Sequence, residues 1–261
     1  VDDATLRSTI QQSLDHVQDI ARIAGRIATG RVTPRDIVAL GKSLFRCDTI
    51  TNELQGNALQ SYRKTLCTLS SQLKPLAELI TTRCNESPPS HMRDGGLFVD
   101  GIDKALDEAR TLQRDAGHWL SNYQSQIVEE SNIGTMKVGY NKVFGYYIEV
   151  SRAQADRVPD NFTRKQTLKN AERYITPELK IFENKVLSAE SMALEREQQL
   201  FRELCHSINE CVHHIVAFAD VIAQLDTLAC FADVAVLYNY VRPTITDEPT
   251  LDIQDGRHPV L

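Results

Sequence analysis

Apolar residues in the first half of the chain recur every three or four positions, which is the spacing of one buried helix face. Residues 6–27 follow this spacing without interruption, so the pattern predicts a single helix that Gly30 ends. Thr33, Pro34 and Asp36 then form a typical helix start, with a capping threonine, a proline at the first helical position and an acidic residue in the first turn. A third helical stretch is predicted over residues 49–84, and the proline and glycine clusters at 87–96 end it.

Two longer amphipathic stretches follow. The first covers residues 102–129, and the second covers residues 176–215 after a capping threonine and a proline, Thr176 and Pro177. At ~1.5 Å per residue these helices would reach about 40 and 60 Å. Two such helices separated by a compact insert are expected to pair in antiparallel orientation, which places the insert at the far end of a stalk.

The insert has a different composition. Residues 135–140 and 144–150 are rich in β-branched and aromatic side chains, with Asn141 and Lys142 between them, and this predicts a β-hairpin. Residues 162–175 fit a helix or a hairpin equally well on pattern alone. A further helix is predicted over residues 216–238, followed by an extended tail. The expected fold is therefore mainly α, a helical core with a long antiparallel helical arm and a small β-rich region at its tip.

Charge distinguishes the same insert from the rest of the chain. The chain carries a formal net charge of −6, but residues 131–175 contain eight basic and four acidic side chains, a local charge of +4. An anionic partner would be steered to that segment.

Residues 164–170 concentrate cations and neutral donors that suit phosphate oxygens. The candidate nucleic-acid contacts are Arg164, Lys165, Lys169 and Asn170, with Lys142 and Arg152 as weaker candidates. An ordinary solvated loop is the alternative interpretation of these charges. The nearby aromatic residues fit a small hydrophobic core better than a base-stacking surface; they are Tyr140, Phe144, Tyr146 and Tyr147.

The common catalytic motifs are absent from the sequence. It contains no GxxxxGKS/T phosphate loop, GxGxxG, HExxH or GxSxG, so the chain alone is not expected to be an enzyme. His206, Glu210 and His214 could hold a metal on one helix face, but a solvated polar face explains this spacing more simply. The six cysteines show no CxxC spacing and are expected to be reduced thiols of a cytosolic protein. No unbroken apolar run has membrane-spanning length, and the acidic N-terminus does not resemble a secretory signal.

Two motifs in the insert identify a family. Residues 137–150 (KVGYNKVFGYYIEV) and 164–174 (RKQTLKNAERY) closely resemble the clamp of the MutS family of DNA mismatch-repair ATPases. Residues 27–36, 224–229 and 240–243 are similar to the core domain of that family, and residues 256–261 resemble the entry to its ATPase domain. The resemblance covers essentially the whole chain, which begins with Val1 instead of Met and is expected to be part of a longer protein.

The resemblance implies a division of the chain and settles the ambiguous stretch. Residues 1–130 would be helical core and outgoing lever helix, 131–175 the β-rich DNA clamp, 176–240 the return lever helix and core, and 241–261 a linker and the start of the ATPase domain. Residues 164–175 would be strands that turn near Lys169, Asn170 and Ala171.

The resemblance also implies a function. The chain would be the lever and clamp of a bacterial-type, cytoplasmic, nucleoid-associated protein that grips the backbone of double-stranded DNA without reading its sequence. Mismatch-reading and connector domains would precede it, and an ATPase domain using ATP and Mg²⁺ would follow. The whole protein would act as a homodimer with downstream mismatch-repair proteins, while this chain would hold no cofactor and contact no membrane.

A second hypothesis comes from another functional class. The chain would be a structural coiled-coil arm whose basic tip docks an acidic protein partner. Competition by plain duplex DNA, with a steep dependence on salt, would separate the two hypotheses.

Overall fold

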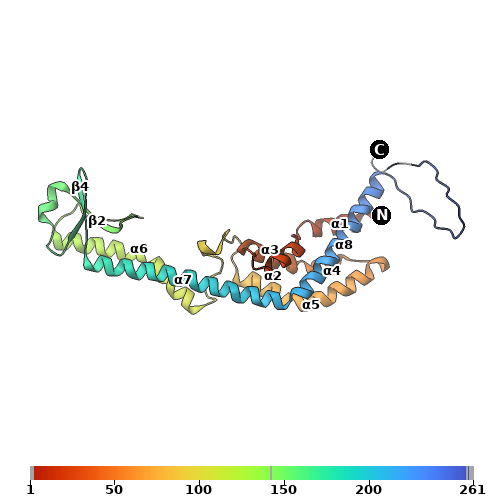
Figure 1. Ribbon diagram of the computed structural model, residues 1–261, viewed down its shortest axis with the longest axis horizontal. Coiled ribbons are helices and arrows are strands. Elements are labelled where there is room, and N and C mark those ends of the chain that lie inside the picture. The colour runs from red at the N-terminus through yellow and green to blue at the C-terminus, as the bar shows by residue number, and fades with distance from the viewer. Residues whose placement is uncertain (1–2, 142, 257, 259–261) are drawn as a thin grey trace.

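The computed structural model describes residues 3–141, 143–256 and 258. The helices are α1 (Ala4–Leu14), α2 (Ile20–Ala28), α3 (Pro34–Phe45), α4 (Cys47–Glu53), α5 (Gln60–Arg83), α6 (Lys104–Ser131), α7 (Pro177–Glu210) and α8 (Val212–Leu237), with short 3-10 turns η1 (Asn57–Leu59), η2 (Met92–Asp94) and η3 (Arg152–Arg157). The strands are β1 (Lys137–Asn141), β2 (Gly145–Ser151), β3 (Thr163–Thr167) and β4 (Ala171–Ile175). The molecule is elongated, with α1–α5 and α8 as a body at one end, α6 and α7 as an arm, and the sheet at the far end (Figure 1). The predicted mainly α fold with a small β-rich tip is confirmed.

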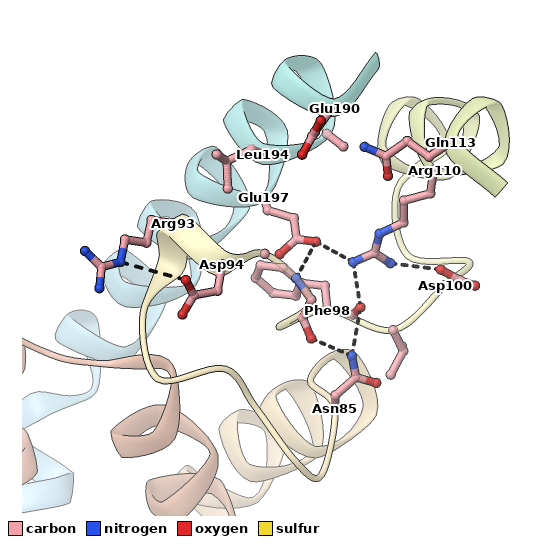
Figure 2. A pocket seen from close by; sticks show the side chains of 14 residues that line it. Asn85, Arg93, Asp94, Phe98, Asp100, Arg110, Gln113, Glu190, Leu194 and Glu197 are labelled. Atoms are coloured by element: carbon pink, nitrogen blue, oxygen red, sulfur yellow. Dashed lines mark hydrogen bonds and ion pairs between the residues drawn. The ribbon is translucent and has the colours of Figure 1, made fainter. Parts of the chain in front are cut away.

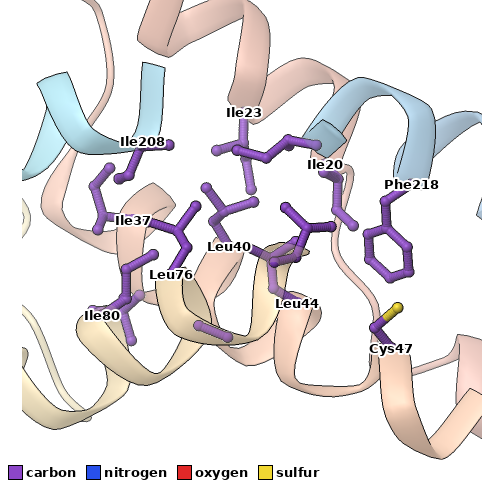
Figure 3. Close-up of a cluster of buried hydrophobic side chains, with 14 of the residues drawn as sticks. Ile20, Ile23, Ile37, Leu40, Leu44, Cys47, Leu76, Ile80, Ile208 and Phe218 are labelled. Atoms are coloured by element: carbon purple, nitrogen blue, oxygen red, sulfur yellow. The ribbon is translucent and has the colours of Figure 1, made fainter. Parts of the chain in front are cut away.

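The body is held together by one apolar core. Ile37 and Leu40 of α3 point toward Ile80 of α5, and Phe218 of α8 closes the cluster from the other side (Figure 3). Each such side chain contributes about 1.5–3 kcal/mol when it is buried. Gly41 allows α3 and α5 to approach closely, since a Cβ there would lie 2.5 Å from Cγ2 of Ile80.

The start of α3 is the one that the sequence predicts. Thr33 accepts a hydrogen bond from the backbone N–H of Asp36, and the Asp36 carboxylate accepts one from the backbone N–H of Thr33. This capping box satisfies two of the amide groups that a helix N-terminus leaves without partners.

Three predicted helix boundaries are wrong. Residues 6–27 form α1 and α2 and not one helix, because Asp19 accepts from the backbone N–H of Arg22 (3.0 Å) and starts a new helix. The stretch at 49–84 is divided into α4 and α5 by the segment 54–59. The return helix ends at Glu210 and not at 215, because the helix is interrupted at Cys211 and α8 turns back onto the body. The 34 residues of α7 therefore reach about 50 Å.

The helix α8 is, among the described residues, the one helix long and apolar enough to span a membrane, with a mean hydropathy of 1.7 over an 18-residue window. A search for unbroken apolar runs misses it because Asp220 and Asp226 interrupt the sequence. Its Phe218 and Leu225 are buried in the body core. The core helix of a globular protein can have the same length and hydropathy as a membrane-spanning helix.

The base of the arm is a polar joint (Figure 2). Glu197 of α7 is 4% exposed, pairs with Nη2 of Arg110 on α6 (2.5 Å), and accepts from the backbone N–H groups of Gly96 (3.0 Å) and Leu97 (3.2 Å). Arg110 also donates to the carbonyl of Phe98 (3.0 Å). These groups line a cavity of about 510 Å³ between α6, α7 and the 94–100 loop. The joint thus connects both arm helices to the body through one buried carboxylate.

The sheet at the tip has the strand order β1-β2-β4-β3, and every neighbouring pair is antiparallel. Both hairpins are confirmed, and the ambiguous residues 162–175 are strands, as the family resemblance implies. The inner face of the sheet carries Ile148 and Val150, which pack with Ile127 of α6 and Leu179 of α7 in a second, smaller core. The tip therefore has its own core, separate from that of the body.

Candidate nucleic-acid interface

The β3–β4 turn at residues 168–170 holds two of the predicted contacts. The turn is closed by a hydrogen bond from the backbone N–H of Leu168 to the carbonyl of Ala171 (2.8 Å). Lys169 and Asn170 are exposed, and within the described part of the chain neither side chain has a hydrogen-bond or ion-pair partner. A free ammonium and a free amide on a tight turn are available to an anion without breaking an existing contact.

Arg152 lies beside this turn. Its backbone N–H donates to the carbonyl of Asn170 (3.1 Å), which ties the start of η3 to the turn. The positive charge of Arg152 also acts on Glu172, two residues beyond Asn170. The structure thus brings Arg152, a weaker candidate in the sequence, next to Asn170.

Arg164 and Lys165 are already engaged by other parts of the sheet. Nη1 of Arg164 lies 3.5 Å from Oε2 of Glu172, and Nζ of Lys165 donates to the carbonyl of Phe144 (3.1 Å). The register between β3 and β4 shifts at this point, so Lys165 is an extra residue in a β-bulge. Arg164 remains 62% exposed. Lys165 would have to break its hydrogen bond to the Phe144 carbonyl before its ammonium group could turn fully toward a ligand. The remaining candidate, Lys142, lies outside the described residues.

Glu172 is a buried carboxylate beside these arginines that the sequence interpretation did not single out. It is 8% exposed and lies opposite Val150 of β2, on the inner face of the sheet. Oη of Tyr174 donates to its Oε2 (2.6 Å). This hydrogen bond and the charges of Arg164 and Arg152 lower the pKa of Glu172 below its ordinary value of 4.5, while burial and the same hydrogen bond raise the pKa of Tyr174 to about 12. The sequence signal was a carboxylate two residues before Tyr174, and therefore on the same strand face as a core position.

Arg173 points to the opposite face and has a structural role. Its Nε donates to Glu149 (3.0 Å), its Nη1 donates to Gln166 (3.2 Å), and its guanidinium lies 4.0 Å from the centroid of the Tyr147 ring. The positive segment is therefore divided, with Arg173 held inside the sheet framework and Arg152, Arg164 and Lys169 on its surface.

The aromatic residues do not all behave as predicted. Tyr146 packs against Phe182 of α7 and Tyr147 lies against Arg173, which fits a structural role. Tyr140 is 54% exposed and Phe144 is 44% exposed, so the prediction of a core role is wrong for these two. They flank the β1–β2 turn, where few other elements are near enough to cover them.

The sheet is fixed to the arm by a second buried carboxylate. Glu183 of α7 accepts from the backbone N–H of Tyr146 (3.2 Å) and from Nζ of Lys180 (2.5 Å). Gly145 has a φ of +74°, and a Cβ there would overlap the Glu183 carboxylate. The backbone conformation and the lack of space each favour glycine at this position. Beside this contact, the rings of Trp119 and Phe182 stack at 3.8 Å and join α6 to α7.

The histidine face does not have the geometry of a metal site. His206 and Glu210 form an exposed pair at 3.7 Å, but the helix break at Cys211 places His214 in α8. No group of three potential ligands is close enough to hold a metal ion within the ranges that the structure describes. The spacing of four residues puts side chains on one face only in an unbroken helix, and the helix is broken at Cys211.

The comparisons with known proteins fall on this region and on the chain as a whole. The model of MutS family domain IV matches residues 101–192, which include the sheet and the outer part of the arm. The DNA mismatch repair protein MutS of Salinibacter ruber (strain DSM 13855 / M31) is 39% identical over 264 residues, covering 100% of this chain. The chain belongs to the MutS family.

Other family members agree over the same length. Two more relatives align along almost the whole chain. The DNA mismatch repair protein MutS of Rhodopirellula baltica is 41% identical over 98% of this chain, and that of Alkaliphilus oremlandii is 38% identical over 99% of it. The chain spans about 29% of the length of each of these three MutS proteins. All candidate contacts of this MutS chain lie in the segment that the domain IV model matches.

Proposed function

We propose that the sheet at the tip of the arm grips the sugar–phosphate backbone of double-stranded DNA as a clamp. The observation that carries this proposal is the turn at Lys169 and Asn170, whose exposed donors have no partner within the described residues. It stands in a segment of net charge +4 on a chain of net charge −6. Cations and small donors on a turn position a duplex without reading its bases, so binding is independent of sequence.

In the whole protein, the arm serves as a lever that couples the clamp to the ATP state. ATP and Mg²⁺ bind in a part of the protein outside this chain, which is itself not an enzyme. Two copies close around one duplex as a homodimer, in the bacterial cytoplasm and at the nucleoid, and downstream mismatch-repair proteins act on that complex. The names of the three relatives, all DNA mismatch repair proteins, support this role.

The test is fluorescence-anisotropy binding of the chain to a labelled, fully paired duplex from low to physiological salt. Each phosphate contact contributes about −0.9 to the slope of log affinity against log salt. Lys169→Ala is expected to weaken binding equally for unrelated duplex sequences and to make the slope shallower by ~1. Lys104→Ala is the matched control, because Lys104 is an exposed lysine at the base of the arm.

An unchanged slope in Lys169→Ala would remove this residue from the interface. Absence of duplex binding even at low salt, together with salt-sensitive binding of a poly-glutamate probe, would favour an acidic protein as the partner of the tip.

A further inference from the structure

A carboxylate is buried inside the clamp close to Arg164 and to the β3–β4 turn. We propose that Glu172 is a positioning residue, which holds the guanidinium of Arg164 in place to receive a phosphate of the DNA backbone. This inference rests on the proposed function and goes beyond it, because it assigns a role in DNA binding to a residue that DNA does not touch.

The position of Glu172 needs an explanation. It lies opposite Val150, which is fully buried, and opposite Thr167 of the edge strand β3. An ionised carboxylate in an apolar surrounding is costly unless it is paired and hydrogen-bonded. Its side-chain partners within the described residues are Tyr174 and Arg164, so the arginine is part of what keeps Glu172 ionised there.

The two partners differ in mobility. Tyr174 is 7% exposed, and its ring packs edge-on against Phe162, so its hydroxyl fixes Oε2 of Glu172 from the inside. Arg164 reaches the same oxygen from the outer strand and remains largely exposed. The carboxylate is therefore the fixed member of the pair, and the long arginine side chain is the member that it orients.

The orientation leaves Arg164 able to bind a ligand. A guanidinium has five N–H donors in a rigid plane, and Glu172 engages Nη1 at 3.5 Å. The other donors remain for phosphate oxygens. The backbone N–H of Arg152 donates to the carbonyl of Asn170, so a second exposed arginine lies beside the turn that carries Lys169. Arg152, Arg164 and Lys169 outnumber the single carboxylate, so the site stays positive.

Two opposing effects of Glu172 on DNA binding can be compared. Ordering one long side chain in advance is worth roughly 2- to 12-fold in affinity. Repulsion between the carboxylate and a phosphate bridged by the guanidinium acts over roughly 7–8 Å. Because Arg164 is 62% exposed, solvent and salt screen this repulsion nearly as in water, and it weakens binding about twofold. Pre-ordering is the larger effect, and it disappears when the arginine is absent. The sign of the Glu172 contribution should therefore depend on Arg164.

The experiment is a double-mutant cycle read by duplex anisotropy. Glu172→Gln keeps the size of the side chain and is measured with Arg164 present and in the Arg164→Ala background. We expect the substitution to weaken binding roughly 2- to 10-fold when Arg164 is present. In the Arg164→Ala background it should leave binding unchanged or tighten it about twofold. A merely structural role would not reverse in this way.

A second variant tests the fixed end of the pair. Tyr174→Phe keeps the ring but removes the hydroxyl that holds the carboxylate, so it should weaken DNA binding less than Glu172→Gln does. In a Glu172→Gln background, Tyr174→Phe should cause no further loss of DNA binding. Circular dichroism checks that each variant has the parent helix content and thermal midpoint. If Glu172→Gln lowers the midpoint, Tyr174→Phe alone carries the test, through its dependence on Arg164.

The outcomes separate this inference from the function on which it rests. Equal weakening by Glu172→Gln in both arginine backgrounds, or tightening in both, overturns the positioning role even when Lys169→Ala shows that the clamp binds DNA. If the unmodified chain does not bind duplex DNA at all, the proposed function is overturned, and the positioning role with it.

Discussion

Removing the charge of Glu197 should loosen the joint between the arm and the body. The Glu197→Gln substitution keeps the shape of the side chain but replaces one acceptor oxygen by an NH₂ group. That group would face either the Arg110 guanidinium and the amide of Gly96, which both bind Oε1, or the amide of Leu97, which binds Oε2, and all three are donors. A donor placed against a donor leaves at least one buried group unsatisfied.

The size of the effect follows from burial. Glu197 is almost fully buried, and removing one partner of a buried ion pair costs about 3–5 kcal/mol. Arg110 keeps the carbonyl of Phe98 and the carboxylate of Asp100 as partners, so the lower end of this range applies. We expect a loss of about 3 kcal/mol in the free energy of unfolding.

Urea unfolding followed by circular dichroism measures this loss. With an m-value of about 3 kcal/mol per molar, the midpoint should fall by about 1 M. Glu190→Gln is the matched control, because Glu190 lines the same cavity from the same helix, is exposed, and has no side-chain partner among the described residues. The backbone amides of Gly96 and Leu97 should also exchange faster in Glu197→Gln. If Glu197→Gln costs no more than Glu190→Gln, the carboxylate does not hold the joint.

Two further substitutions test the attachment of the sheet and the response to acid. Gly145→Ala places a Cβ against Glu183 at a φ of +74°, so we expect a loss of about 2 kcal/mol or more in thermal unfolding, and a loss below 0.5 kcal/mol would contradict the contact. Hydrogen bonds from Arg196 lower the pKa of Asp103 below its ordinary value of 3.8, against the effect of burial. Because the folded-state pKa is the lower one, this stabilisation is present above about pH 4 and is lost as the pH falls further. Asp103→Asn keeps a helix-capping side chain and should unfold less steeply between pH 4 and 2, whereas identical acid-unfolding curves would exclude this role.

Periodicity predicts the helices whose ends carry local signals. The capping box at Thr33 and the proline at 177 fix the starts of α3 and α7. The breaks at 15–19 and at Cys211 escape detection because the apolar spacing continues through them in phase. At the first break the Asp19 cap is a local signal, but a contact with another helix adds to it, since the backbone N–H of Gln18 donates to Ser43 (3.0 Å). Such a contact has no trace in a local pattern.

The polar joints could have been predicted in part. The apolar stripe of α7 runs through Leu179, Ala189, Ala193 and Leu200, and Glu183 and Glu197 occupy positions on the same stripe. A carboxylate at a core position is a signal that a buried partner exists. The identity of the partner is out of reach, since Arg110 is 87 residues from Glu197 in the sequence.

Three buried glutamates lie at or near the contacts between the parts of the molecule. Glu197 lies between body and arm, Glu183 between arm and sheet, and Glu172 inside the sheet. The hydrophobic effect between apolar helix faces is non-directional and does not by itself select one register. A carboxylate bound to particular backbone amides cannot slide without leaving a charge unsatisfied. The aromatic stack of Trp119 and Phe182 adds bulk between the helices, but Glu183 and Glu197 set the register at the two ends of the arm. If the arm acts as the proposed lever, a displacement at the 94–100 loop should reach the β3–β4 turn only while these carboxylates stay bound.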